Sequence, residues 1–122
     1  MPCDYELDLK RRRVLCRAWG VVTYDEALAN RNNFLKDPDF SPDFDQLYDA
    51  CGVTRLIISA SETGMLAMDA VFNQKSRRAL VAPRSDIYDF GRMFTLYRSI
   101  NSYKDQIRLF RTREQAEAWL DG

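Results

Sequence analysis

The sequence contains no histidine, and this absence removes several kinds of catalysis. Serine triads that rely on an imidazole base, histidine-ligated metals and histidine acid–base catalysis are all excluded. The cysteines Cys3, Cys16 and Cys51 are far apart and lack the CxxC pattern of zinc sites, so we expect no metal site. An odd number of distant thiols is typical of reduced cytoplasmic cysteines rather than of a disulfide framework.

Glycine is also scarce, with five residues in a chain of 122. Neither GxGxxG nor the P-loop pattern GxxxxGKS/T occurs in the sequence. The loops that hold nucleotide phosphates depend on these patterns. We therefore expect no nucleotide cofactor, and the sequence indicates no other cofactor.

Net charge and long apolar runs are absent as well. Eighteen basic side chains balance eighteen acidic ones, which argues against nucleic-acid binding. Apolar runs such as "ALVA" at 79–82 are too short to cross a bilayer, so no integral membrane segment is expected. The amino-terminal "MPCDYELDLKRRR" is charged where a signal peptide would be apolar, which predicts a cytoplasmic location. With 46% hydrophobic residues, 1–122 is expected to form a single domain.

Hydrophobic periodicity predicts alternating strands and helices. Strands are expected at 3–9, 13–19, 44–50, 77–82 and 106–111, and helices at 23–37, 60–72, 86–100 and after Thr112. The order is β-β-α-β-α-β-α-β-α, with an opening hairpin through "KRRR" at 10–13. Later strands separated by helices require parallel, right-handed crossovers, so we predict an α/β fold with a mixed sheet covered by helices. The continuous "ALVA" run predicts that 77–82 is an internal strand.

The stretch "YDACGVTRLIISASETGML" at 48–66 is interpreted as a strand, a Gly-Val-Thr turn at 52–54 and the start of a helix. Met65, Met68 and Phe72 form one stripe of this helix, and we expect them in the core.

Helix 86–100 has two apolar stripes, formed by Ile87, Phe90, Phe94 and Tyr97 and by Met93, Leu96 and Ile100. Together they exceed what one sheet face can cover. The sequence therefore predicts a homodimer that uses Phe94, Tyr97 or nearby residues.

Several segments also carry a family resemblance. They are "AWGVVTYDEALAN", "FLKDPDFSPDFDQLYDACGVT", "SRRALVAP" and "LFRTREQAEAWL", and they cover most of the chain. In order and spacing the chain resembles the STAS domain of anti-sigma-factor antagonists. It is more similar still to the bacterial STAS/SEC14 group, often called SpoIIAA-like.

This resemblance implies a non-catalytic domain built on a STAS-like sheet. STAS domains bind a protein partner, and in the antagonist branch phosphorylation of a serine at the helix start blocks that binding. SEC14-like relatives instead enclose a lipid or another apolar ligand. The serines at the matching helix start are Ser59 and Ser61.

Ser59 and Ser61 have two interpretations. Both can cap the helix, Ser59 with Glu62 as its capping-box partner. One of them could instead be a phosphosite, because a helix start favours a phosphate. The antagonist branch places an Asp before the phosphorylated serine, whereas Ile58 and Ala60 precede these serines. We therefore favour the cap.

Arg84 and Ser85 follow the internal strand in "APRSD". In open parallel sheets ligands bind beyond the carboxyl ends of strands, so this loop is expected near Ser59 and Ser61. Arg84 could then hold a carboxylate or phosphate. The alternative is that Ser85 caps its helix and Arg84 is solvated.

The sequence as a whole predicts a binding or regulatory domain rather than an enzyme. Its partner would be a regulatory protein or a small apolar or anionic ligand, and a SEC14-like carrier is the main alternative. An enzyme using serine and carboxylate groups is a remote alternative. A ligand cavity between sheet and helices would distinguish a carrier from a protein-binding module.

Overall fold

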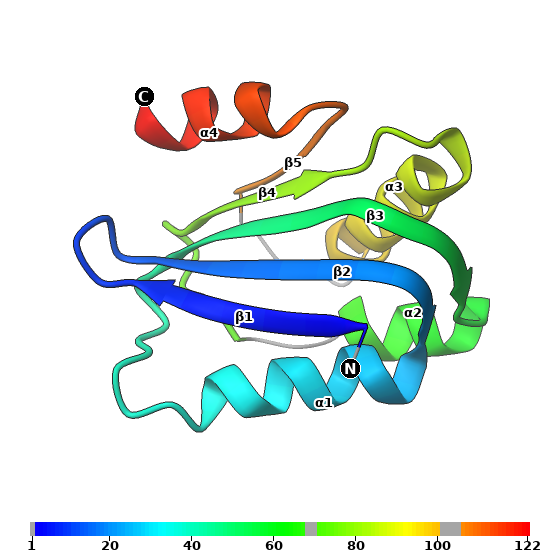
Figure 1. The fold of residues 1–122 in the computed structure, drawn as a ribbon, viewed down its shortest axis with the longest axis horizontal. Helices are drawn as coiled ribbons and strands as arrows, with labels where there is room; N and C mark the ends of the chain where they lie inside the picture. The colour runs from blue at the N-terminus through cyan, green and yellow to red at the C-terminus, as the bar shows by residue number, and fades with distance from the viewer. Residues whose placement is uncertain (1, 68–70, 101–105) are drawn as a thin grey trace.

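The computed structural model describes residues 2–67, 71–100 and 106–122, and in this part of the chain five strands alternate with four helices (Figure 1). The elements are β1 Cys3–Asp8, β2 Arg13–Thr23, α1 Tyr24–Leu35, β3 Asp45–Ile57, α2 Ala60–Ala67, β4 Arg77–Val81, α3 Ser85–Ile100, β5 Gln106–Phe110 and α4 Arg113–Asp121. The mixed α/β architecture expected from the sequence is confirmed.

The strands form one sheet in the spatial order β1-β2-β3-β4-β5. β1 and β2 are antiparallel, and each later neighbour pair is parallel. β4 lies between β3 and β5, so the prediction that 77–82 forms an internal strand is confirmed. On one face Ala79 and Val81 are fully buried, and on the other Arg78 is 8% exposed, as a strand covered on both faces requires.

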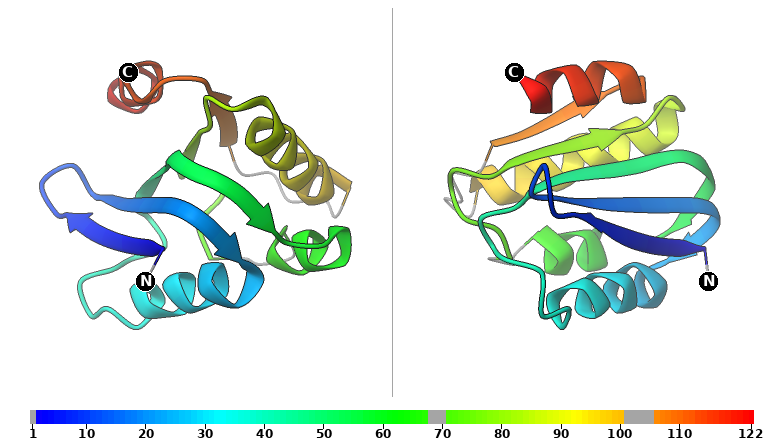
Figure 2. Two further views of the ribbon diagram at one scale, coloured as in Figure 1. Left: turned by 45° about the vertical axis from the view of Figure 1, so that its right-hand side comes forward. Right: turned by 60° about the vertical axis from the view of Figure 1, so that its left-hand side comes forward.

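The helices cover the sheet unequally. Right-handed crossovers that always advance in one direction carry their helices on one face, and α1, α2 and α3 lie on the same side of the sheet (Figure 2). α4 covers the other face, where Ala116 and Leu120 pack on Leu47, Ala79 and Val81. The fold therefore has three layers: the sheet lies in the middle, with three helices on one face and α4 on the other.

β3 is much longer than predicted, because the expected turn at Gly52 is part of the strand. Gly52 pairs with Trp19 of β2 beside a β-bulge, and a Cβ atom on Gly52 would lie 2.9 Å from the Trp19 Cβ. This close approach explains the glycine without a turn. Gly20, with a φ of 65°, lies at the second irregularity of the β2–β3 register.

α2 is shorter than the predicted helix of 60–72. Its described residues are Ala60–Ala67, and Val71 and Phe72 are buried outside any helix. Met65 is 49% exposed, so its expected place in the core is wrong, and Met68 lies outside the described residues. No helix in the described ranges is long and apolar enough to cross a membrane.

Candidate functional site: an apolar cavity

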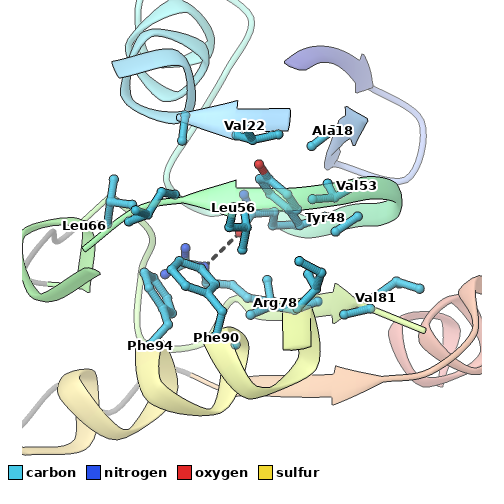
Figure 3. A pocket seen from close by; sticks show the side chains of 18 of the residues that line it. Ala18, Val22, Tyr48, Val53, Leu56, Leu66, Arg78, Val81, Phe90 and Phe94 are labelled. Atoms are coloured by element: carbon cyan, nitrogen blue, oxygen red, sulfur yellow. Dashed lines mark hydrogen bonds between the residues drawn. The ribbon is translucent and has the colours of Figure 1, made fainter. Parts of the chain in front are cut away.

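A largely apolar cavity of about 140 Å³ lies between the sheet and helices α1, α2 and α3 (Figure 3). It is similar in volume to an engineered protein cavity of about 150 Å³ that binds benzene. Phe90 and Phe94 of α3 lie on one side, opposite Tyr48 and Leu56 of β3, and Leu66 of α2 lies at one end. The cavity is thus lined by elements that are distant in the sequence.

Strand alternation explains which side chains line the cavity. On β3, Gln46 and Tyr48 face the α1–α3 side, whereas Leu47 packs under α4. On β4, Arg78 and Leu80 line the cavity in the same way. The alternation of side chains therefore gives β3 and β4 one face toward α4 and one toward the cavity.

Arg78 is a buried polar side chain on the cavity wall with several protein contacts. It is 8% exposed, and its Nε donates a hydrogen bond of 3.0 Å to the Gln46 Oε1 atom. Its guanidinium carbon lies 4.7 Å from the ring centroid of Phe72 and 5.8 Å from that of Phe94. These cation–π contacts fix the guanidinium at the edge of an otherwise apolar space.

Two further polar side chains on the wall bond to backbone carbonyl oxygens, although in the described part of the chain the buried Arg31 Nε forms no hydrogen bond. The Asn30 amide donates to the Asp4 carbonyl oxygen at 3.3 Å, and Arg31 Nη1 donates to the Leu66 carbonyl oxygen at 3.4 Å. Tyr48 packs against the core cluster that contains Cys3. Burial, and then the neighbouring cysteines, raise the pKa of Tyr48 well above its ordinary value.

The cysteines are not activated as nucleophiles. Burial raises the pKa of Cys16 to about 12 and also raises that of Cys3. Cys51 is exposed, but desolvation and then the nearby Asp49 carboxylate raise its pKa to about 11. Because the thiolate is the reactive form, these thiols are poor nucleophiles near neutral pH.

Ser59 forms the capping box at the start of α2. Its Oγ accepts a hydrogen bond from the Glu62 backbone N–H at 3.1 Å, and Glu62 Oε1 accepts one from the Ser59 N–H at 2.9 Å. Ser61 is exposed in the first turn of the helix. The cap interpretation of Ser59 therefore has the expected geometry, and phosphorylation of either serine stays a prediction.

Arg84 and Ser85 lie at the start of α3, and the structure does not bring them together with the two serines. Arg84 forms an exposed ion pair of 3.3 Å with Asp86. β4 ends at Val81, which is paired with Asp49, whereas β3 continues to Ile57 before Ser59 follows. The strand order also never reverses along the sheet, so no crevice forms at a switch point.

Sequence reasoning missed the cavity. Phe90 and Phe94 were assigned to one apolar stripe of the helix, and Phe94 to a dimer interface, whereas both side chains line the cavity. The available indication was Arg78, which immediately precedes the apolar run of β4. A buried arginine is uncommon and requires special partners.

No protein-family model matches the chain, and neither does any curated protein or any solved structure.

Proposed function

We propose that the protein is a non-catalytic binding domain whose cavity holds a small, mainly apolar ligand. The cavity of about 140 Å³ is the observation that carries this proposal. Protein interiors are close-packed, and voids larger than a water molecule are few. This proposal follows the SEC14-like side of the resemblance, in which an apolar ligand is enclosed, in preference to a STAS-type partner switch.

The chemistry of the site also favours binding over catalysis. The chain has no histidine, and the thiols have raised pKa values. In the described ranges no group of three His, Cys, Asp or Glu residues could hold a metal ion. The free thiols Cys3, Cys16 and Cys51 fit a reducing compartment, which supports a cytoplasmic location as part of this proposal.

Native mass spectrometry of protein purified from the cells that make it tests the proposal. The wild type should carry an additional small mass that is lost on denaturation. Leu56→Phe, which adds volume inside the cavity, should remove most of it. Ile57→Phe is the matched control, because Ile57 is the next residue of β3 and is 50% exposed. An absent mass in the wild type, or equal loss in both variants, would contradict the proposal.

Protein association is a second candidate function, favoured by the outer stripe of α3. Met93, Leu96 and Ile100 are 42%, 59% and 67% exposed. Phe94 instead lines the cavity, so it is not the centre of an interface. The partner would be a second copy of this chain or a regulatory protein.

Light scattering tests the homodimer. A dimer at high micromolar concentration that Leu96→Glu converts to monomer is expected if this stripe is the interface. A wild-type protein that is monomeric at that concentration would leave the cavity as its main functional feature.

A further inference from the structure

We propose that the cavity ligand is a neutral molecule with a single aromatic ring, an inference that rests on the proposed function. Three features of the cavity carry it. They are the bonding of its polar side chains, the rings around it, and its volume.

The bonding of the polar side chains argues for a neutral ligand. Arg78 is held by Gln46, Phe72 and Phe94, and Arg31 donates to the Leu66 carbonyl oxygen. An anion entering the cavity would exchange its hydration shell for a mostly apolar lining, and its charge would be buried there. A neutral ligand avoids this cost.

The rings around the cavity argue for an aromatic ligand. Phe34, Tyr48, Phe72, Phe90 and Phe94 all line it, from α1, β3, the segment before β4, and α3. Rings that meet edge-to-face or offset gain attraction beyond the burial of apolar area. A ring bound here could therefore form contacts that a saturated molecule of similar size cannot.

The volume argues for one ring. A cavity of about 140 Å³ is close to the size that accepts benzene. The cavity is therefore too small for the whole lipid that the SEC14-like resemblance implies. It can hold a much smaller molecule, or the ring-bearing end of a larger one.

Dissociation constants of three probes, measured by titration calorimetry on the purified full chain, test this proposal. Benzene should bind about 2- to 10-fold more tightly than cyclohexane, the range expected for aromatic contacts. Benzoate should bind about 100-fold more weakly than benzene, because its charge would be buried. Leu56→Phe should weaken benzene binding, and Ile57→Phe should leave it unchanged. If Leu56→Phe does not fold, Leu66→Phe narrows the cavity from α2 instead.

Several outcomes would overturn the proposal. Benzoate binding at least as tightly as benzene would show that the ligand is anionic, and cyclohexane binding equally well would remove the aromatic preference. Benzene binding that survives both cavity-filling variants would place the probe elsewhere. If no probe binds but native mass spectrometry still detects a bound molecule, this ligand class is wrong and the proposed function stands. If neither method detects binding, both fail.

Discussion

At the scale of single residues, the serines at the start of α2 are not equivalent. Ser59 exchanges two hydrogen bonds with Glu62, whereas Ser61 is exposed within the first turn. A phosphate on Ser59 would also meet the Glu62 carboxylate, which already accepts the Ser59 N–H. The structure therefore gives Ser59 a capping role that phosphorylation would disturb.

Replacing each serine by alanine separates the two positions. Ser59→Ala should lower the free energy of unfolding by about 1 kcal/mol, because the capping hydrogen bond is lost. Ser61→Ala should change it by less than about 0.5 kcal/mol, as is usual for an exposed site. Urea unfolding measures both values. Equal effects at the two positions would show that Ser59 is not the cap.

Two glycines give a second matched comparison. Gly52→Ala should destabilise the protein by about 1–3 kcal/mol, because the new Cβ would lie 2.9 Å from the Trp19 Cβ across the β2–β3 pair. Gly64→Ala in α2 should stabilise it by about 0.5–1 kcal/mol, because nothing lies within 4 Å of the new methyl group and alanine favours a helix. Thermal unfolding measures both changes. If Gly52→Ala left the stability unchanged, the two strands could separate at this point without a cost in free energy.

At the scale of elements, α2 is held at its carboxyl end by its neighbours. Arg98 of α3 donates a hydrogen bond of 2.8 Å to the Ala67 carbonyl oxygen, and Arg31 of α1 donates to that of Leu66. Cationic side chains near the carboxyl end of a helix stabilise it, because that end of the helix dipole is negative. A helix of eight residues is marginal by itself, so these tethers should determine how often it opens.

Arg98→Met is expected to loosen α2 selectively. Backbone amides of α2 should exchange their hydrogens faster, because one tether to its terminal carbonyl is lost. Amides of β4 should keep their wild-type rates, since this strand lies inside the sheet. Hydrogen exchange followed by NMR measures both sets. Unchanged exchange in α2 would contradict its dependence on this arginine.

The elements also show what the sequence could predict. The internal position of β4 followed from "ALVA", because a continuous apolar run requires cover on both faces. The extent of β3 did not follow, since the reason for Gly52 is its contact with Trp19, a residue 33 positions away. A local sequence pattern indicates which face of a helix or strand is buried. It does not indicate how closely that helix or strand packs against another one.

The same limit applies to the cavity. Periodicity placed Phe90 and Phe94 on one apolar stripe of α3 without saying what the stripe faces, and both side chains line the cavity. Whether inward side chains fill the space depends on how closely α2 and α3 approach the sheet. That spacing is set by packing among distant segments, which no single stretch of sequence encodes.

At the scale of the whole molecule, buried thiols make stability depend on pH. Burial raises the pKa of Cys16 from 9 to about 12, so the folded protein holds this proton more tightly than the unfolded chain does. The contribution of Cys16 to the free energy of unfolding should therefore be constant below pH 9 and fall by about 1.4 kcal/mol per pH unit between pH 9 and about 12. Cys3 and Cys51 should add to this decline. Tyr48, whose pKa is also raised, should add to the loss at higher pH.

Urea unfolding at several pH values above and below 9 measures this dependence. Cys16→Ala should show a shallower decline, because the variant has no thiol to ionise on unfolding. Its stability at neutral pH should be lower by a constant amount from the lost packing, which does not affect the slope. Identical slopes in wild type and variant would mean that the Cys16 thiol is not protected by burial.

The central claim is that the ligand site is the cavity and not the outer stripe of α3. Intermolecular nuclear Overhauser effects from bound benzene measure this most directly, because they report which protein protons lie within a few ångströms of the probe. We predict contacts to Leu56, Leu66 and Phe90, which line the cavity. Contacts confined to Met93 and Leu96, on the exposed side of α3, would contradict the account.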